Sequence, residues 1–212
     1  MGISIVMVGS GGVGKSALTL RFVRSEFNDH YNPTIDSSFT KLVQVSSETT
    51  VNVDIHDTAG QEVFSSLRAK YYPEADGFVL CYSITDDETF AALKELHEEI
   101  LDLHSNPNVP LCLVGTKWDL ADTERVVSVK EGRSFAESIN AVEFYETSAK
   151  LNKSVSDIFV KMSQSIAVSQ AHAANNTGSV FGAEVVQKRA QQDVDSSNVT
   201  KNATPDACCT IT

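Results

Sequence analysis

Residues 9–16 (GSGGVGKS) follow the pattern G-x-x-x-x-G-K-[ST] and constrain the fold more than any other segment. An apolar run, residues 3–8, precedes them, and an amphipathic segment, residues 17–24, follows. Strand, glycine-rich loop and helix form the context in which this pattern binds phosphate. Glycines permit backbone dihedrals at which successive N–H groups point at one anion, and the positive end of the helix adds to the attraction. We expect Lys15 to reach the β- and γ-phosphates of a nucleotide and Ser16 to bind Mg²⁺.

Length and composition indicate one domain with an extension. The chain has 212 residues, of which 42% are hydrophobic, enough for a buried core. The net charge of −11 argues against nucleic acid as a partner, because phosphate backbones are bound by clustered Lys and Arg. We expect no secretory signal and no membrane-spanning helix. After residue 173 the sequence is rich in Asn, Gln, Ser, Thr and Ala, so we predict a domain over 1–173 and a flexible tail over 174–212.

Strand-like and helix-like segments alternate along the predicted domain. Continuous apolar runs at 77–83 and 111–114 predict parallel strands covered on both faces. Runs at 39–45 and 51–55, joined by a polar turn, predict a hairpin. The other predicted elements are a strand at 143–145 and helices near 65–71, 90–100, 128–139 and 155–166. This order predicts an α/β fold of the P-loop NTPase class, in which a mostly parallel six-stranded sheet has helices on both faces and one antiparallel edge strand.

A second motif, residues 57–61 (DTAGQ), follows the third predicted strand, and we expect it to lie in a loop over 57–62. The carboxylate of Asp57, beside a phosphate loop, suits a role at Mg²⁺. The N–H of Gly60 can meet a γ-phosphate, and Gln61 can orient a water for in-line attack. The alternative is a simple turn, because Asp, Thr and Gly are turn formers.

Two further motifs, residues 116–119 (TKWD) and 148–150 (SAK), follow the fifth and sixth predicted strands. Both lie at the carboxyl ends of strands, where ligands bind in open α/β sheets. Asp119 can accept hydrogen bonds from N1–H and the 2-amino group of guanine, and the Ala149 N–H can donate to O6. Adenine lacks both donors and would leave the carboxylate without partners. In a structural alternative, Asp119 is a helix cap or turn residue.

These motifs, in this order, resemble those of Ras-family small GTPases along residues 3–170. The matching segments are 9–16, 31–34, 57–62, 117–119 and 148–150. The resemblance implies that Thr34 contacts Mg²⁺ and the γ-phosphate in the GTP state and that Phe27 packs against guanine. It also implies that the loops around Thr34 and Gly60 are the two switches.

The resemblance assigns a role to each matching residue. The residues implied for catalysis are Lys15, Thr34, Gly60 and Gln61, and those implied for Mg²⁺ are Ser16, Thr34 and Asp57. The residues implied to bind GTP or GDP are Gly9, Gly11, Gly12, Val13, Gly14, Lys15, Ser16, Ala17, Phe27, Tyr31, Thr34, Gly60, Thr116, Lys117, Asp119, Ser148, Ala149 and Lys150.

Three positions depart from the pattern of the resemblance. Thr116 stands where the members closest to Ras usually carry Asn, and its single hydroxyl makes fewer hydrogen bonds than an amide. The Rho branch also uses Thr there, so we expect guanine binding to survive. Ser37 replaces an acidic residue and Phe39 a Tyr in the implied effector segment, residues 31–39. We therefore expect effectors to be selected differently from those of Ras proteins with an acidic segment.

Several side chains near the motifs have simpler interpretations. His56 precedes Asp57 and can perturb a metal site, but we favour a packed, hydrogen-bonded structural histidine. Cys81 and Cys112 lie in apolar runs and are predicted to be buried thiols. Trp118 is the one tryptophan of the chain, and we expect its emission to change when nucleotide binds, unless the ring is exposed and insensitive to the ligand.

The resemblance implies a GTP-binding switch that cycles between active GTP-bound and inactive GDP-bound forms. Its implied partners are a GTPase-activating protein, a guanine nucleotide exchange factor and effectors. One rival is a nucleotide-loaded module that never cycles, and the presence of Gln61, Gly60 and Thr34 argues against it. The other rival is a P-loop kinase, which needs an acceptor pocket and a lid and leaves the guanine motifs unexplained.

The sequence ends in Cys209-Thr210-Ile211-Thr212, which fits the prenylation pattern C-a-a-X. Thr is not a common last residue of this pattern, so the sequence does not predict which isoprenoid is attached. One lipid holds a membrane only marginally, and the tail has no polybasic patch, which makes Cys208 the natural second site. We expect a lipid-anchored protein on the cytoplasmic face of the plasma membrane or another membrane. The alternative is two unmodified cysteines.

Overall fold

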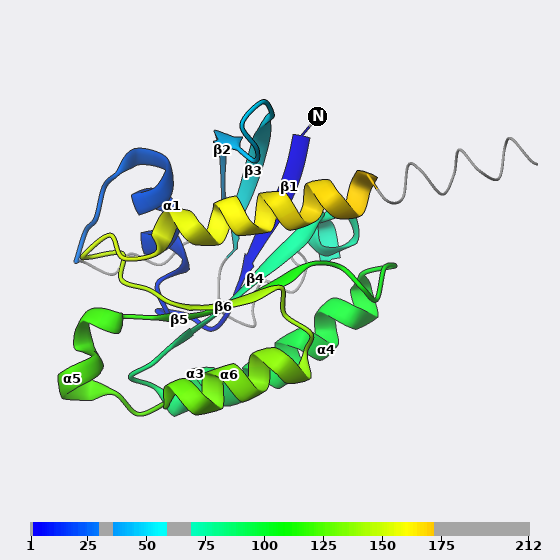
Figure 1. The fold of residues 1–212 in the computed structure, drawn as a ribbon. Helices are drawn as coiled ribbons and strands as arrows, with labels where there is room; N and C mark the ends of the chain where they lie inside the picture. Colours follow the sequence, from blue (N-terminus) through cyan, green and yellow to red (C-terminus); the bar gives the residue numbers. More distant parts are fainter. Residues whose placement is uncertain (1, 30–35, 59–68, 172–212) are drawn as a thin grey trace, which may run out of the picture. The chain divides into compact units, whose positions relative to one another are not determined.

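Six strands form the sheet, in the spatial order β2-β3-β1-β4-β5-β6. A computed structural model describes residues 2–29, 36–58 and 69–171 (Figure 1). The strand bounds are Gly2–Val8 (β1), Asp36–Gln44 (β2), Thr50–Thr58 (β3), Gly77–Ser83 (β4), Leu111–Thr116 (β5) and Glu143–Glu146 (β6). All neighbouring strands are parallel except β2, which pairs antiparallel with β3 at one edge. The predicted α/β fold, with its antiparallel edge strand, is therefore confirmed.

Helices cover both faces of the sheet (Figure 1). The α-helices are Lys15–Arg24 (α1), Asp87–Ala91 (α3), Leu93–Leu103 (α4), Ala121–Glu124 (α5) and Val129–Ser138 (α6), and residues 69–71 and 155–171 are also helical. Short 3₁₀ helices span Tyr72–Glu74 (η2) and Trp118–Leu120 (η3). Helix α1 and residues 155–168 lie on one face, and α3, α4 and α6 lie on the other. Of the helix predicted near 65–71, the first four residues lie outside the described part of the chain.

The core is formed on both faces of the sheet, and it covers the interior strands β4 and β5 completely. Every residue of β4 and β5 is buried, as their continuous apolar sequences predict. On one face, the rings of Phe22 in α1 and Phe159 in the last helix stack with their centroids 4.2 Å apart. On the other face, Tyr72 packs edge-on against Phe78. Burying a large apolar side chain stabilises a fold by about 1.5–3 kcal/mol, so these two layers fix the helices against the sheet.

Local signals explain where two of the helices begin. Asp86 accepts hydrogen bonds from the N–H groups of Glu88 and Thr89 at the start of α3. Ser128 and Glu131 form a reciprocal capping box at the start of α6. Such side chains satisfy N–H groups that have no acceptor within the helix, and each is worth about 1 kcal/mol.

Strands β3 and β5 extend further at their carboxyl ends than their apolar residues predict, and β2 begins three residues earlier, at Asp36. Strand β3 runs to Thr58, so Asp57 and Thr58 lie in a strand and the expectation of a loop beginning at Asp57 is wrong. The antiparallel ladder with β2 continues to Thr58, and Thr58 Oγ1 donates to Met7 O at 2.8 Å. Strand β5 likewise continues to Thr116. Ladder pairing and side-chain hydrogen bonds hold the polar residues Asp57, Thr58 and Thr116 in these strands.

The chain separates into two compact units, residues 1–168 and 169–212. In the second unit the structure describes only residues 169–171, which are helical. The predicted division into a domain over 1–173 and a tail over 174–212 stays a prediction. Among the described residues, no helix is both long enough and apolar enough to cross a bilayer.

Candidate functional site

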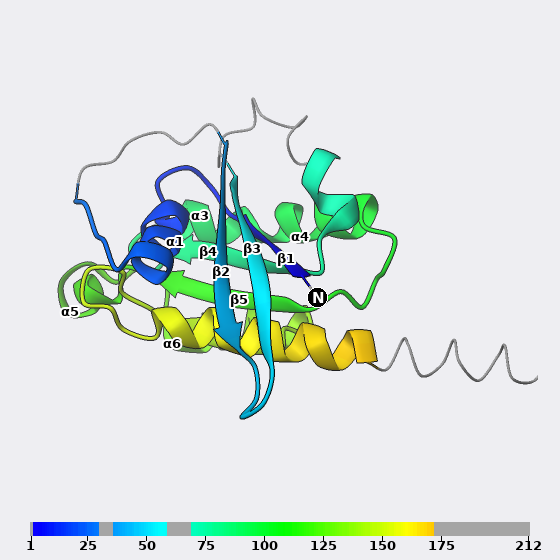
Figure 2. The same cartoon turned by 90° about the horizontal axis from the view of Figure 1, so that it is seen from above.

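The predicted motifs gather at one edge of the sheet, where the parallel strands end. Val8 of β1 lies opposite Leu80 of β4, and Ser83 of β4 lies opposite Thr116 of β5. The loops that follow β1, β5 and β6 are therefore neighbours, although more than 130 positions separate the first of them from the last. Figure 2 shows the same arrangement from above, with α1 beginning after β1 and the hairpin of β2 and β3 extending beyond the other strands.

Residues 9–16 have the backbone of a phosphate-binding loop. Gly9, Gly12 and Gly14 have φ values of 150°, 73° and 103°, which side chains disfavour. A Cβ on Gly9 would also overlap the carbonyl oxygen of Cys81. Gly14 precedes α1, so the N–H groups of the first turn, including Lys15, have no acceptor within the helix. These N–H groups can bind an anion.

Lys15 is held inside this loop. Its side chain is 5% exposed, and its Nζ donates to Gly9 O at 2.7 Å and Ser10 O at 2.9 Å. An ammonium has three donors, so a third can serve a phosphate oxygen. Burial lowers the pKa of Lys15, while Asp57 opposes that shift. Because a bound phosphate would favour the charged form, the site is suited to an anion.

The other residues predicted to bind phosphate or Mg²⁺ lie in the same loop, in α1 and in β3. Asp57 is 2% exposed and lies opposite Met7 in the register of β3 with β1. Ser16 and Ala17 are half-buried in the first turn of α1, Val13 is buried in the core, and Gly11 and Gly12 are exposed. A carboxylate and a hydroxyl beside a phosphate cradle are the hard oxygen ligands that Mg²⁺ prefers, so Asp57 and Ser16 fit that ion.

Thr116 connects the phosphate loop to the middle of the sheet. Its Oγ1 lies 2.5 Å from Val13 O and 2.9 Å from Tyr82 O. A hydroxyl has one proton and can donate to one of these carbonyls at a time, whereas an amide NH₂ has two. The departure at Thr116 therefore retains the connection with fewer donors.

The two predicted guanine loops are in direct contact. Lys117 adopts a left-handed conformation with φ of 62°, and the next N–H, that of Trp118, donates to Thr147 O at 2.9 Å. Ser148 Oγ donates to Asp119 Oδ1 at 2.6 Å. A carboxylate can accept about four hydrogen bonds, so Asp119 is oriented by Ser148 and retains capacity for a ligand. Asp119 is not a helix N-cap, because it lies within η3 and the N-cap residues of η3 and α5 are Lys117 and Leu120.

Arg21 on α1 is a site residue that the sequence motifs did not reveal. Its Nε donates to Ala149 O at 2.7 Å, and a terminal nitrogen lies 3.3 Å from Lys150 O. Its guanidinium carbon also lies 5.7 Å from the centre of the half-buried Phe27 ring. Arg21 thus holds the second guanine loop against the ring implied to pack on the base. The hydrogen bonds to Ala149 and Lys150 leave no local pattern in the sequence, because these residues are 128 and 129 positions from Arg21.

The remaining implied residues differ in how far the structure describes them. Lys150 is exposed, with its Nζ 4.0 Å from a carboxylate oxygen of Asp29. Tyr31, Thr34, Gly60 and Gln61 lie outside the described residues, and their roles stay predictions.

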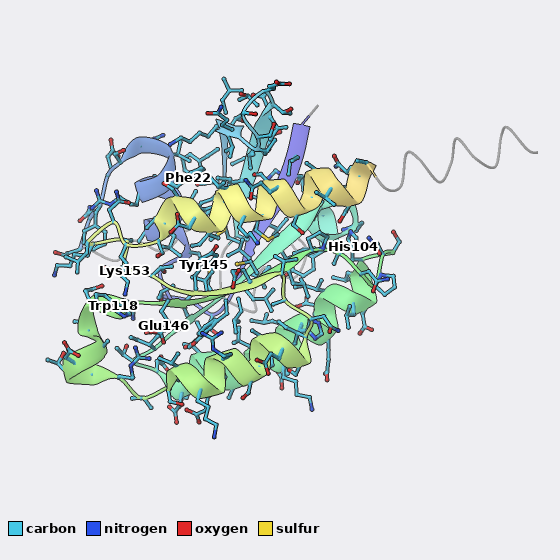
Figure 3. The ribbon with its side chains drawn as sticks, in the orientation of Figure 1. Phe22, His104, Trp118, Tyr145, Glu146 and Lys153 are labelled. Atoms are coloured by element: carbon cyan, nitrogen blue, oxygen red, sulfur yellow. The ribbon has the colours of Figure 1, made fainter. Side chains whose placement is uncertain are left out.

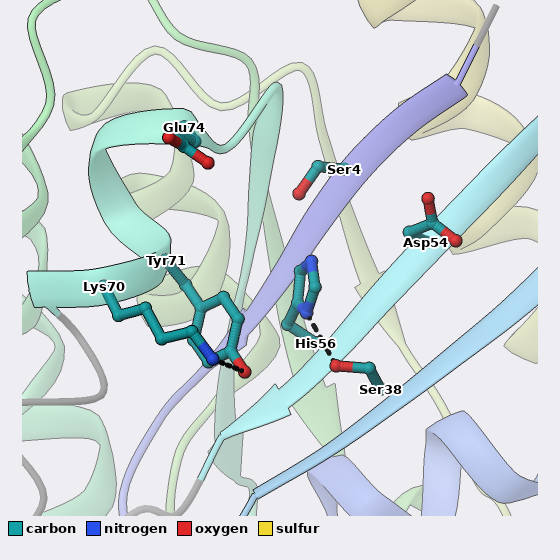
Figure 4. Close-up of a pocket in the computed structure, with 7 residues that line it drawn as sticks. All are labelled: Ser4, Ser38, Asp54, His56, Lys70, Tyr71 and Glu74. Atoms are coloured by element: carbon teal, nitrogen blue, oxygen red, sulfur yellow. Dashed lines mark hydrogen bonds between the residues drawn. The ribbon is translucent and has the colours of Figure 1, made fainter.

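His56 contributes to a separate cavity (Figure 4). Its Nδ1 lies 2.9 Å from Ser38 Oγ, and its ring stacks on Tyr71 with centroids 4.4 Å apart. The cavity has a volume of about 320 Å³ and is lined by Ser4, Ser38, Asp54, His56, Lys70, Tyr71 and Glu74. The prediction of a packed, hydrogen-bonded histidine is confirmed. The buried thiols are also confirmed, since Cys81 and Cys112 are both 0% exposed.

A glycine-rich phosphate loop and a contacting pair of guanine loops, at the carboxyl edge of this sheet, define a small GTP-binding protein of the P-loop class. A family model for the Ras family matches residues 4–168. Over 166 residues, the chain is 44% identical to Ras-like protein 2 of Mucor circinelloides f. lusitanicus, an alignment that covers 78% of this chain and 82% of the relative. The chain therefore belongs to the Ras family, and this membership supports a GTP-binding switch with GTPase activity.

Proposed function

We propose that the protein is a Mg²⁺-dependent GTPase that cycles between GTP-bound and GDP-bound forms in membrane-associated signal transduction. The observation that carries this proposal is the placement of Asp119, fixed by Ser148, on the same sheet edge as the buried Lys15. A base-reading carboxylate and a phosphate-binding ammonium at that edge are the two ends of a nucleotide site.

Recognition of guanine rests on the two contacting loops. Asp119 accepts from N1–H and the 2-amino group, and the Ala149 N–H donates to O6. Adenine would leave the carboxylate without those donors, which costs about 1–3 kcal/mol or more for a charged group. Phe27 and Lys117 cover the faces of the base, while Tyr31 and Lys150 complete the pocket.

The phosphate end orients the group that reacts. Lys15 and the N–H groups of residues 11–17 hold the phosphate oxygens, and Ser16, Asp57 and Thr34 would hold Mg²⁺. When bound, that ion neutralises charge on the β- and γ-phosphate oxygens. Gln61 orients the attacking water, and the Gly60 N–H binds the γ-phosphate.

Hydrolysis is proposed to be slow in the isolated protein. Phosphoryl transfer depends on positioning and charge neutralisation, and the sequence has no obvious arginine finger in the Thr34 loop. An arginine supplied by an activating protein would raise the rate by about 10³–10⁵. Gly11 lies where such a finger approaches in the family, so Gly11→Val should block stimulation.

The first experiment is to identify the nucleotide in the purified protein and to measure single-turnover hydrolysis. We expect GDP or GTP, together with slow, Mg²⁺-dependent release of phosphate. Gln61→Leu should lower both the basal and the stimulated rate, whereas a chain that binds nucleotide without hydrolysing it would be a binding module. Adenine nucleotide in the purified protein would contradict the assignment of the base.

Membrane attachment is proposed to come from the tail. A prenyl group on Cys209, with a second lipid on Cys208, would hold the protein on the cytoplasmic face of the plasma membrane or another membrane. Cys209→Ser should release the protein to the soluble fraction. Unchanged fractionation of that variant would overturn the assignment.

Effectors are proposed to bind residues 31–39 and the adjacent edge strand β2. Added strands at an edge gain affinity from backbone hydrogen bonds, and neighbouring charges tune specificity and on-rate. Ser37 lacks the negative charge that a basic effector would meet. Ser37→Asp should therefore strengthen binding to a strongly basic Ras-binding domain in the GTP state, and equal affinities in a titration would exclude this role.

A further inference from the structure

A lysine outside every motif contacts the tryptophan of the first guanine loop. The Nζ atom of Lys153 lies 2.9 Å from the centre of the Trp118 ring system, and both side chains are half-buried (Figure 3). An ammonium over the face of an indole is attracted by the negative face of the ring, and tryptophan is the strongest such partner. The two residues are 35 positions apart, so neither predicts the other in the sequence.

The backbone of Lys153 closes the second guanine loop. The N–H of Lys153 donates to Ser148 O at 2.9 Å, and the N–H of Ser148 donates to Lys153 O at 3.2 Å. The N–H of Leu151 donates to Ser148 Oγ at 3.0 Å. Lys153 is therefore fixed to the residue that orients Asp119, and the position of its side chain depends on the geometry of this loop.

Trp118 is fixed to the same region from the first loop. The backbone N–H of Trp118 donates to Thr147 O, and the carboxylate of the next residue, Asp119, accepts from Ser148 Oγ. The Trp118–Lys153 contact lies beside these two hydrogen bonds and joins the outer ends of both loops. Figure 3 shows the two side chains at the same end of the domain, Lys153 from the segment before the last helix and Trp118 from the segment after β5.

We propose that Trp118 and Lys153 form a clamp that holds the two guanine loops together and slows release of the guanine nucleotide. The clamp rests on the proposed function, since it positions Asp119 and Ser148 without touching the base. Opening either loop separates the ring from the ammonium, so the attraction adds to the barrier that the nucleotide must cross to leave.

Partial burial strengthens such a clamp. Burial lowers the pKa of Lys153, Arg125 lowers it further, and Glu146 opposes the shift. Because the half-buried Lys153 side chain lies directly over the Trp118 ring, its ammonium has lost part of its hydration, which makes contact with the ring more favourable than it would be in water. A contact of this kind corresponds to about 3- to 30-fold in an equilibrium constant.

The test is the rate of GDP release from the full chain, with a fluorescent GDP and EDTA. Lys153→Met retains most of the length and loses the charge, and we expect release about 3- to 30-fold faster. Lys153→Arg should restore slow release because a guanidinium also binds an indole face. Lys130→Met, an exposed lysine on α6, removes the same charge away from the site and should leave the rate unchanged.

A double-mutant cycle separates the clamp from a general loss of stability. In Trp118→Leu, the further change Lys153→Met should have no effect on release, because the ring that the ammonium contacts is already gone. Equal effects of Lys153→Met in the wild-type and Trp118→Leu backgrounds would overturn the proposal. An unchanged release rate for Lys153→Met would also overturn it.

Emission of Trp118 gives a readout that needs no nucleotide chemistry. The chain has one tryptophan, so its spectrum reports on this ring alone. Lys153→Met should shift the spectrum and Lys130→Met should not. If the wild-type protein binds no guanine nucleotide, the proposed function fails. If it binds nucleotide but the spectra of wild type and Lys153→Met coincide, the clamp fails while the function stands.

Discussion

The two ends of the proposed nucleotide site are stabilised in different ways. The phosphate loop is held by its own backbone, with three glycines at positive φ and a lysine bonded to two carbonyls of the same loop. The guanine loops are held by the side chain of Arg21 from α1 and by contacts between the two loops, those of Ser148 with Asp119 and of Lys153 with Trp118. A site held by local backbone geometry tolerates few substitutions within it. A site held by side-chain contacts can be loosened from outside.

The largest effect should come from Gly9→Ala. The new Cβ would overlap the backbone carbonyl of Cys81, which cannot rotate away. Overpacking of this kind usually costs about 1–3 kcal/mol, and we expect about 3 kcal/mol in the free energy of unfolding here, with loss of nucleotide binding. Urea unfolding and nucleotide content measure the two effects.

Gly12→Ala is the matched control for Gly9→Ala. Gly12 has φ of 73°, but no atom lies within 4 Å of its ideal Cβ. Its cost should be limited to the conformational penalty of about 1–2 kcal/mol. Equal losses in the two variants would mean that φ, rather than the contact with Cys81, constrains the loop.

Arg21→Ala should have the next largest effect and should act on the guanine end alone. The substitution removes the hydrogen bonds from the guanidinium to the carbonyls of Ala149 and Lys150. It also removes the cation–π contact with the Phe27 ring. Hydrogen bonds to charged groups contribute about 1.5–3 kcal/mol, so GDP release should accelerate about 10-fold or more. Stopped-flow release of a fluorescent GDP measures the rate.

Arg24→Ala tests whether the effect belongs to Arg21. Arg24 lies in the same last turn of α1, with its guanidinium 5.4 Å from the centre of the Phe39 ring. Its removal should change GDP release by less than about 2-fold, because Arg24 is exposed and the Phe39 ring is outside the guanine loops. A cation–ring contact at an exposed site contributes only about 0.5–1 kcal/mol. Equal acceleration in both variants would assign the effect to the helix end.

Thr116→Val should have a smaller effect, because it weakens the connection between the phosphate loop and strands β4 and β5. The substitution retains the shape of the side chain but leaves Val13 O and Tyr82 O without the hydroxyl. We expect a loss of about 1 kcal/mol in the free energy of unfolding and a release of GDP about 5-fold faster. Thr116→Ser retains the hydroxyl and should behave like wild type, and a Ser variant as damaged as the Val variant would show that the methyl group matters instead.

The smallest effect at neutral pH concerns the charge on Lys15. Its pKa is lowered in the folded protein, so between that value and 10.5 the unfolded chain binds more protons. The free energy of unfolding of nucleotide-free protein should therefore rise with pH in this window, as burial of the charge is relieved. Lys15→Met should remove this rise in urea unfolding at alkaline pH, and identical pH slopes would contradict it.

The comparison also explains what could be predicted from sequence. The phosphate loop is a local pattern, and strand, glycines and helix are adjacent in the chain. Asp119 and Ser148 were found because each belongs to a short motif. Arg21 and Lys153 belong to none, and their contacts arise only when the sheet brings distant loops together. The apolar residues alone predict ends of β3 and β5 that are too early, because Asp57, Thr58 and Thr116 are polar and pairing with neighbouring strands outweighs that local signal.

Complete burial of β4 and β5 has a consequence for exchange of amide hydrogens. All residues of β4 and β5 are buried, and both strands end at the nucleotide site. Amides in such strands exchange with deuterium only through the most complete opening of the domain, whereas surface loops exchange through local opening. Loss of nucleotide should therefore raise deuterium uptake in the loops after β5 and β6 while β4 stays protected. An exchange factor would then need only to promote the local opening of these loops. The chain would stay folded after it loses its nucleotide and could bind another.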